Sequence, residues 1–396
     1  MLDFQKLIPQ IATLADEASP DKDRSREILS LAQASFEEAT KDEAAFAELL
    51  KRNGANTFWP TAIPLEPFTQ SDSLSTFEGT HSVVACDGSQ IMPTQHEIAS
   101  CFLLNIGAVV LHYGENSRAQ LSSHPHLFHR TEDLYPLINK RRIHIDESLV
   151  SFERGLKELN HARLLAEQEQ QAGHKVLTLI DGSLIPFGVD RNADRIQQEL
   201  IDRFEVELDA FNAAELPLLG YISSSRSSDL VNTLRIWRCP YPDSRCHTYC
   251  NSMNEEDYPC SEIWPLSDRI LMASMLPTKS RSSFHLSGSH SSMALRPRNR
   301  ICFAYLKSQQ EAARIEIPTW LFQDKQLLEF SLSALLTQIS KGHGYPISLA
   351  EAHNLAVVRS TDRVQFFQLL AQKLMQSKQA PVAVSPKESR KRRGMV

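Results

Sequence analysis

The chain has 396 residues with a formal net charge of −6, and its hydrophobic fraction of 42% and charged fraction of 23% are those of a globular protein with a substantial core. No apolar run is long enough to span a bilayer, so we expect a soluble protein with no membrane association. The acidic balance argues against a uniformly basic nucleic-acid-binding protein, although it permits a local basic surface. The N-terminus carries acids and lacks the basic start of a signal peptide, so we expect a cytoplasmic location.

The chain begins with a segment that is predicted to be helical. Apolar residues recur at helical spacing over residues 3–17 and 23–52, so residues 1–54 are predicted to form an N-terminal helical arm of two helices. Residues 55–80 contain three closely spaced prolines, which end helices and mark a linker. We therefore expect the main domain over residues 81–376.

Two similar stretches organise this domain. Each has an apolar, β-rich run followed by Asp-Gly-Ser, and the acids are Asp87 and Asp181. A single Asp-Gly is most often a plain turn, but the repetition favours a function. Sites in α/β sheets form beyond the carboxyl ends of strands, where a glycine lets the chain turn and a ligand approach closely. Because carboxylate oxygens suit Mg²⁺ or Mn²⁺, the pair predicts a metal site.

Between the two acids the pattern predicts a hairpin, a loop and a helix. Residues 97–113 are predicted to form two buried strands that turn near residues 105–107, residues 114–136 a polar loop, and residues 146–171 a helix. The loop carries three histidines at a spacing typical of metal ligands: His124, His126 and His129. We interpret them as surface residues, because no cysteine or acid lies beside them at ligand spacing.

After Asp181 the pattern alternates between helices and strands. Helices are predicted at residues 191–214, 229–238, 264–275 and 324–339, strands at 216–223, 300–306 and 313–321, and a flexible polar loop at 278–300. A last helix begins at Tyr345-Pro346 and carries His353. This histidine is either a half-buried packing residue or a group that aids proton transfer at the site.

Four of the seven cysteines lie within a short segment: Cys239, Cys246, Cys250 and Cys260. Without an export signal we expect reduced thiols and no disulfide framework. Their spacing matches neither a paired zinc knuckle nor a ferredoxin run. Two interpretations stay open, a Cys-rich insertion that binds Zn²⁺ or an iron–sulfur cluster, and ordinary reduced cysteines.

The chain ends in a basic segment. Residues 387–393 carry five basic residues and one acid, and they follow a stretch with few helix-forming residues. We predict a flexible basic tail over residues 377–396, which either holds a phosphate backbone or is simply solvated.

Together these segments resemble the NurA family of DNA-end-processing nucleases. The resemblance covers roughly residues 80–375 and rests on two strand ends, an acid-bearing helix between them and a late motif: Cys86-Asp87-Gly88-Ser89, Ile180-Asp181-Gly182-Ser183 and Gly344-Tyr345-Pro346-x2-Leu349-x2-Ala352-His353. It implies an α/β fold with an RNase H-like mixed sheet flanked by helices, together with the N-terminal helical arm and a C-terminal helical region.

The resemblance also implies an activity. The expected protein is a metal-dependent deoxyribonuclease that uses Mn²⁺ or Mg²⁺ in two-metal-ion phosphodiester hydrolysis. It would be a 5′-to-3′ exonuclease, with endonuclease activity on single-stranded DNA, in DNA end resection and double-strand break repair. The implied partners are DNA, a second copy of the chain in a homodimer, and a HerA-like hexameric ATPase.

The family's site residues carry over onto matching positions. Asp87 and Asp181 are implied as metal-binding acids and His353 as the late active-site histidine. For the acid between the two strands we favour Glu147 as catalytic residue and metal ligand, over Asp146 and Glu153. The substrate-binding residues are expected to be Ser89, Ser183 and Tyr345.

Two other functions compete with this one. An actin-like or sugar-kinase-like nucleotide-binding protein shares the same kind of sheet, but the chain has only 14 glycines and no Gly-x-Gly phosphate signature at a strand end. A catalytically silent adaptor for a HerA-like ATPase would keep the fold without the chemistry. The presence of both Asp-Gly-Ser strands and of His353 argues against it.

Overall fold

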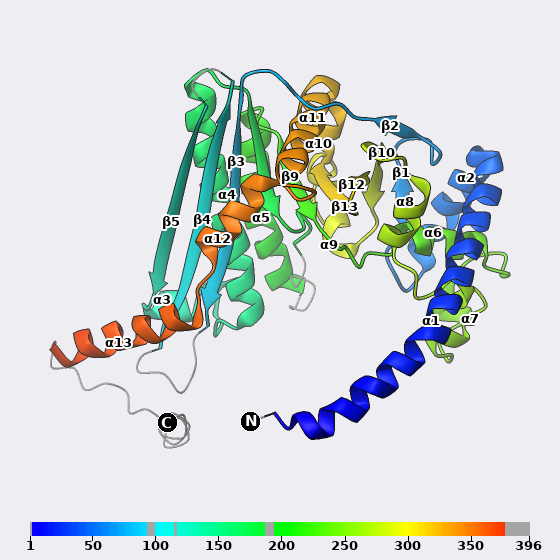
Figure 1. The fold of residues 1–396 in the computed structure, drawn as a ribbon, viewed down its shortest axis with the longest axis horizontal. Helices are drawn as coiled ribbons and strands as arrows, with labels where there is room; N and C mark the ends of the chain where they lie inside the picture. The colour runs from blue at the N-terminus through cyan, green and yellow to red at the C-terminus, as the bar shows by residue number, and fades with distance from the viewer. Residues whose placement is uncertain (1, 93–99, 115–116, 187–193, 377–396) are drawn as a thin grey trace. The chain divides into compact units, whose positions relative to one another are not determined.

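The computed structural model describes residues 2–92, 100–114, 117–186 and 194–376, which form a mixed α/β fold (Figure 1). The chain divides into two compact units, each built from several segments. The first unit comprises Met1–Leu74, Ile222–Met293 and Arg300–Glu316, and the second comprises Ser75–Tyr221, Ala294–Asn299 and Ile317–Val396. The N-terminal segment is thus grouped with the middle of the chain, which differs from the predicted arm, linker and single domain. The predicted basic tail lies outside the described residues.

The second unit contains five neighbouring strands of the main sheet. Its strand order is β9-β8-β3-β4-β5, with bounds β3 (His81–Ile91), β4 (Phe102–Tyr113), β5 (Arg118–Phe128), β8 (Val176–Asp181) and β9 (Leu218–Ile222). Three strands form an antiparallel meander, because β4 pairs antiparallel with both β3 and β5. The other two run parallel to β3, since β8 pairs parallel with β3 and β9 with β8. This order confirms the predicted RNase H-like mixed sheet.

Two predictions between the acids are wrong. Residues 97–113 do not form a hairpin: from Phe102 to Tyr113 the chain is one strand, and Gly107 lies in its middle. The predicted polar loop contains strand β5, which holds His124 and His126. Strand β5 is last in the order, and its residues are exposed or half-exposed in alternation, so its composition resembles that of a loop.

Helices cover both faces of this sheet. Helix α4 (Glu147–Gln171) packs on β3 and β8, and α12 (Ile347–Ala356) packs on β3, β4 and β5. Because α4 links β5 to the parallel strand β8, it is the crossover helix of the unit. The remaining elements of the unit are α3 (Thr131–Leu134), β6 (Leu137–Ile138), β7 (Arg141–Arg142), α5 (Asp194–Ala213), a 3₁₀ turn (Pro297–Asn299), α10 (Thr319–Gln323), α11 (Lys325–Lys341) and α13 (Ser360–Gln376).

The first unit combines a long helix with short antiparallel strands. Its helices are α1 (Phe4–Ala39), α2 (Glu43–Asn53), α6 (Asp229–Trp237), α7 (Cys246–Tyr249), α8 (Asp268–Met275) and α9 (His290–Met293), with 3₁₀ turns at Thr40–Asp42, Gly54–Asn56, Glu255–Asp257 and Ser261–Ile263. Its strands are β1 (Ala62–Pro64), β2 (Ser71–Ser73), β10 (Ser280–Ser282), β11 (His285–Ser287), β12 (Ile301–Lys307) and β13 (Ala312–Pro318). Strand β12 pairs with β10 and β11, which pair in turn with β2 and β1.

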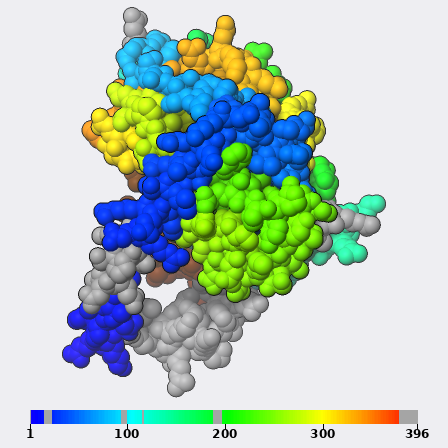
Figure 2. Space-filling model, turned by 90° about the vertical axis from the view of Figure 1, so that its right-hand side faces the viewer, coloured from blue at the N-terminus to red at the C-terminus, as the bar shows by residue number. Residues whose placement is uncertain are grey.

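Two further predictions fail in this unit. The N-terminal segment is one helix, α1, up to Ala39, where two helices were predicted. The segment 278–300 is not a flexible loop, because it contains β10, β11 and α9. Helix α1 packs against α6 and α8. Figure 2 shows the N-terminal segment in blue on the surface beside a green segment from the middle of the chain. Among the described helices, none has the length and apolar character of a membrane span.

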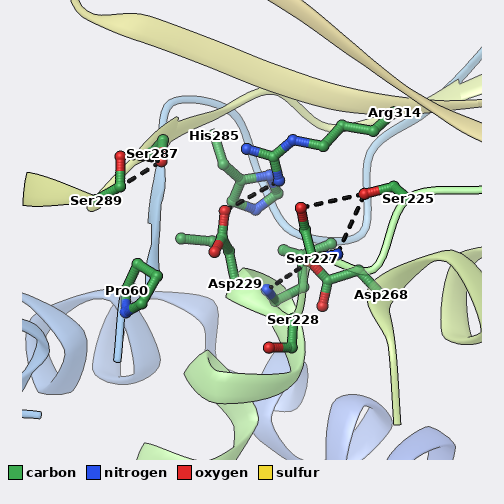
Figure 3. A network of polar contacts seen from close by, with 12 residues as sticks. Pro60, Ser225, Ser227, Ser228, Asp229, Asp268, His285, Ser287, Ser289 and Arg314 are labelled. Atoms are coloured by element: carbon green, nitrogen blue, oxygen red, sulfur yellow. Dashed lines mark hydrogen bonds and ion pairs between the residues drawn. The ribbon is translucent and has the colours of Figure 1, made fainter. Parts of the chain in front are cut away.

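A buried polar network lies inside the first unit (Figure 3). The Arg314 guanidinium pairs with Asp229 at 2.9 Å and with Glu316 at 2.7 Å. Asp268 accepts hydrogen bonds from the backbone N–H groups of Leu230 and Val231. Burial and the nearby Asp229 carboxylate raise the pKa of Asp268 to about 7. Because buried charges are tolerated only when paired and hydrogen-bonded, this network ties α6, α8 and β13 together.

Candidate active site

The register of two strands brings Asp87 and Asp181 together. Strands β3 and β8 run parallel with Cys86 paired to Ile180, so the acid that follows each of them lies at the same end of the sheet. After Asp181 the chain turns at Gly182, whose φ of +112° lies in the region that favours glycine. The structure therefore places both Asp-Gly-Ser acids in one crevice.

His353 joins the two acids from helix α12. Its Nδ1 lies 2.8 Å from Oδ2 of Asp87, and ligand atoms of Asp87, Asp181 and His353 all lie within 4.8 Å of one another. This approach depends on Gly107, the register partner of Asp87 on β4. A Cβ at Gly107 would overlap the backbone of α12 at Ala352 and Ala356. The missing side chain lets the helix lie directly on the strand.

The end of α12 is fastened to the sheet by side chains. The Asn105 amide donates hydrogen bonds to the carbonyls of Leu355 at 3.1 Å and Ala356 at 2.9 Å. The Ser89 hydroxyl also donates to the Ala356 carbonyl. These bonds satisfy carbonyls that a helix end leaves unpaired. Ser89 therefore helps to hold α12 in place, and its substrate-binding role stays a prediction.

A third acid approaches from the opposite face of the sheet. Successive side chains of a strand point to opposite faces, so Gly88 faces α4 while Asp87 faces α12. A Cβ at Gly88 would overlap Oε1 of Glu158, so this carboxyl group lies directly on the backbone beside Asp87. Glu158 and Asp181 line the same cavity of about 290 Å³, together with Arg154. The Arg154 Nε lies 3.2 Å from the Glu158 carboxylate.

Burial, together with neighbouring acids, raises the pKa values of Glu158 and Asp181. Burial raises the pKa of Glu158 to about 8, Arg154 opposes the shift, and Asp87 and Asp181 increase it. The pKa of Asp181 is also raised, mainly by burial and further by Asp87, whereas a hydrogen bond from Tyr345 and the charge of His353 lower it. A carboxyl group that burial keeps protonated releases its proton when a cation binds. The donor set therefore fits a divalent metal ion.

Glu147 is not brought to this group. It is the first residue of α4 and is exposed, eleven residues from Glu158, which is about 16 Å along a helix. The two other acids considered are engaged elsewhere: Asp146 caps α4, and Glu153 pairs with Arg203 at 2.7 Å. Glu158 was missed because it lies three turns inside the helix, where its pairing with Arg154 resembles an ordinary i,i+4 ion pair.

The other expected substrate-binding residues have local partners. The Ser183 hydroxyl accepts a hydrogen bond from the Ile185 N–H at 3.0 Å, which shapes the turn after β8. The Tyr345 hydroxyl donates to Asp181, and its ring contacts Tyr221 edge-on. These contacts show what the two side chains touch, and their substrate-binding role stays a prediction.

The four clustered cysteines all lie in the first unit. Three are buried and Cys239 is half-buried. Burial raises the pKa of Cys246 to about 11, and the thiols of Cys250, Cys260 and Cys239 add to the shift, so the four groups are neighbours. Among the described residues, however, their sulfurs do not form a group within 4.8 Å of one another.

The comparison with protein families agrees with the geometry of the second unit. A family model described as the NurA domain matches residues 81–358, which is more than half of the chain. This range contains Asp87, Glu158, Asp181 and His353. A search of curated proteins found no match. The chain therefore belongs to the NurA domain family, a nuclease family of DNA end processing.

Proposed function

We propose that this protein is a metal-dependent deoxyribonuclease that hydrolyses phosphodiester bonds at DNA ends. The proposal is carried by the convergence of Asp87, Asp181 and His353, whose ligand atoms lie within 4.8 Å of one another. Glu158 supplies a third carboxylate to the cavity that Asp181 lines. Hard carboxylate oxygens are the ligands of Mg²⁺ and Mn²⁺, so Asp87, Asp181 and Glu158 would hold the ions.

The protein's own groups prepare the acids for this role. Oδ1 of Asp87 accepts the Gly88 N–H at 2.8 Å and Oδ2 contacts His353, which fixes the carboxylate plane. The Tyr345 hydroxyl orients Asp181 in the same way. Divalent ions held by these carboxylates would supply the chemistry that activates a water molecule and the charge that stabilises the leaving oxygen of the phosphodiester.

His353 and Arg154 complete the site. Because Asp87 holds Nδ1 of His353, the other ring nitrogen, Nε2, is free to exchange a proton with water or the leaving oxygen. The side chain is 58% exposed, as a group that meets a large substrate needs to be. Arg154 lines the cavity with Glu158 and Asp181, and its guanidinium suits a phosphate oxygen.

The test is digestion of end-labelled single- and double-stranded DNA with Mn²⁺, Mg²⁺ or EDTA. We expect degradation with the metals and none with EDTA, and a loss of at least about 100-fold in Asp87→Asn and Asp181→Asn, because each removes a charged ligand from one site. Asp202→Asn, at an exposed acid of α5, is the matched control. A wild-type rate in either site variant would refute the assignment.

If the wild-type protein cuts nothing, the result favours the catalytically silent adaptor. Repeating the digestion with a HerA-like hexameric ATPase then separates an adaptor from an enzyme that needs its partner. The same substrates, labelled at the 5′ or the 3′ end, test the proposed 5′-to-3′ polarity and the endonuclease activity on single strands. We also propose the homodimer and the role in double-strand break repair, and light scattering of the purified protein tests the first of these.

We propose separately that Cys239, Cys246, Cys250 and Cys260 bind Zn²⁺ or an iron–sulfur cluster. The four thiols are neighbours, and Arg235, which is 2% exposed, donates a hydrogen bond to Cys260. A buried cation of this kind stabilises thiolates around a metal. Zinc, iron and sulfide analysis of anaerobically purified protein, with Cys250→Ser for comparison, tests the proposal. Absence of all three from the wild-type protein would leave ordinary reduced cysteines.

A further inference from the structure

A second group of metal-ligating side chains lies at the other end of strand β3. It consists of Ser82 on β3, His112 on β4, Glu169 in the last turn of α4, and His174 just before β8. Ser82 and His112 are register partners on neighbouring strands. Ser82 precedes Asp87 by five residues, so the group lies about 17 Å along the strand from the candidate active site. None of its residues takes part in the proposed nuclease chemistry.

Four ligand atoms of this group converge on one point. Ser82 Oγ lies 3.0 Å from His112 Nδ1, 3.1 Å from Glu169 Oε2 and 2.7 Å from His174 Nδ1. The two histidine Nδ1 atoms are 3.3 Å apart, and Glu169 Oε2 lies 3.2 Å from the one on His112 and 3.1 Å from the one on His174. All six pairs among the four atoms are thus in contact, which describes a nearly regular tetrahedron.

Hydrogen bonds alone account for only part of this arrangement. The serine hydroxyl has one hydrogen, each Nδ1 has at most one, and an ionised carboxylate has none. At most three hydrogens are therefore available for six contacts. In a tetrahedron each hydrogen can point along only one edge, so at least three edges lack a hydrogen between their atoms. A cation at the centre attracts all four lone pairs and accounts for all six distances.

The size of the tetrahedron fits a small divalent ion. With edges of about 3.1 Å, the centre lies about 1.9 Å from each corner, close to the ~2.0–2.2 Å of zinc–nitrogen and zinc–oxygen bonds. Two imidazoles and a carboxylate suit Zn²⁺ and other first-row divalent metals, and not Ca²⁺ or Mg²⁺, which prefer oxygen ligands.

Three of the four proposed ligands are buried or nearly buried, and the fourth lies beside a cavity. The side chains of His112 and Glu169 are 6% and 11% exposed, and Ser82 is fully buried. The His174 side chain is 30% exposed and lines a cavity of about 310 Å³ with Gln170, Lys175 and Asp324. A metal can enter through this cavity and be retained by buried ligands.

We propose that Ser82, His112, Glu169 and His174 form a structural binding site for Zn²⁺ or a similar divalent transition metal. The ligands come from four separate segments of the chain, so the ion joins β3, β4, α4 and the residues just before β8. All four positions are filled by the protein, which is typical of a structural site and not of a catalytic one. The site is independent of the metal ions proposed for the nuclease reaction.

The test compares the number of zinc ions bound per chain in the wild type and in variants of the proposed ligands. Protein with its affinity tag removed is stripped with a chelator, loaded with Zn²⁺, freed of excess ion and analysed for metal content. We expect Glu169→Gln and His174→Ala to hold one zinc ion fewer per chain than the wild type, or to bind it at least about 10- to 100-fold more weakly in a competition with a chromophoric chelator. His129→Ala, at an exposed histidine of the same unit, should match the wild type.

Three further measurements separate this site from the others. Asp181→Asn should keep the zinc, because it alters only the nuclease site, and Cys250→Ser should also keep the ion that Glu169→Gln loses. Cobalt in this site should give visible bands without the thiolate charge-transfer bands of a cysteine site. Zinc should raise the melting temperature of the wild type more than that of His174→Ala, which keeps the other metal sites. Because the His174 side chain is 30% exposed, its replacement should remove a ligand without unfolding the protein.

Equal zinc content and affinity in wild type, Glu169→Gln and His174→Ala would overturn the proposal. The group would then be a hydrogen-bonded packing cluster. Should Glu169→Gln fail to fold, as judged by circular dichroism, His174→Ala alone decides between the two outcomes.

Discussion

Nδ1 of His353 lies 2.8 Å from Oδ2 of Asp87, although the two residues are 266 positions apart in the chain. This contact joins a helix near the end of the NurA domain to the first strand of the sheet. It depends on the flat surface that Gly107 leaves opposite Asp87, and on the hydrogen bonds from Asn105 that hold the last turn of α12.

Replacing Gly107 should therefore lower the nuclease rate, although Gly107 is not itself one of the proposed catalytic residues. In Gly107→Ala the new Cβ overlaps the backbone of α12, so the helix must shift and carry His353 away from Asp87. Since a misplacement of about 1 Å costs up to 100-fold in rate, we expect a loss of nuclease activity between about 10- and 100-fold. The measurement is the rate on end-labelled DNA with saturating Mn²⁺.

The matched control is Gly155→Ala in helix α4, where a Cβ meets no atom within 4 Å. Alanine in the interior of a helix is favoured over glycine by about 1 kcal/mol, so this variant should unfold at a higher denaturant concentration than the wild type. Full activity of Gly107→Ala would show that α12 does not need its close contact with β4.

A pair of substitutions on α4 identifies the third acid. Glu158→Gln should lower cleavage by at least about 100-fold, because it removes a charge from the cavity that Asp181 lines, while Glu147→Gln should stay within about twofold of the wild type. Both changes are isosteric, and both are made on the same helix. The reverse result would restore Glu147 to the role that the sequence first indicated.

The raised pKa of Glu158 predicts a dependence of stability on pH. An unfolded glutamate ionises near its ordinary value of 4.5, and the folded one only near pH 8. Between these values the folded protein binds more protons, so its free energy of unfolding falls as the pH rises, by at most about 1.4 kcal/mol per pH unit from this group. Below the first value and above the second the contribution is constant.

Urea unfolding in EDTA at pH 5.5, 6.5 and 7.5 measures this slope. Glu158→Gln should flatten it, because an amide does not titrate, and Mn²⁺ should offset the loss in the wild type by binding the ionised form. Identical slopes for the two proteins would exclude Glu158 as the titrating group.

Tyr345 offers a test of the second acid. Its hydroxyl lowers the pKa of Asp181, so Tyr345→Phe should raise that pKa and move the acidic limb of the pH–rate profile to higher pH. A hydrogen bond to a charged group is worth about 1.5–3 kcal/mol, which limits the shift to about one or two pH units. We expect a several-fold loss of rate at pH 6 that narrows at pH 8.5.

Tyr135→Phe, at an exposed tyrosine of the same unit, controls for loss of a hydroxyl group. A uniform loss of rate at every pH in Tyr345→Phe would indicate that the hydroxyl of Tyr345 contacts the DNA and does not set the pKa of Asp181.

The sequence carried enough information for the two strand ends and the late histidine. Asp87, Asp181 and His353 were identified because each lies in a motif whose type and order are unusual. The middle of the sheet was harder. Gly107 resembles a turn residue, but the glycine is required by a helix that packs there, and that contact comes from residues about 250 positions later.

The third acid and the second ligand group could not be found from local patterns. Nothing in the local sequence distinguishes Glu158 from the other acids of α4. What distinguishes it is its contact with Gly88, which depends on how the helix packs on the sheet. Likewise Ser82, His112, Glu169 and His174 are spread over more than 90 positions, with no metal-ligand spacing between them. The register of the strands and the length of α4 bring these residues together, and a single sequence predicts neither of them accurately.

The distance in sequence between Asp87 and His353 also has a consequence for synthesis of the protein. A chain made from its N-terminus has both strand acids long before α12 leaves the ribosome. Helix α12 can dock on β4 only after residue 356 has emerged, so His353 is not held beside Asp87 in any shorter nascent chain. The candidate active site is thus completed only near the end of translation, and unfinished chains lack one of its parts.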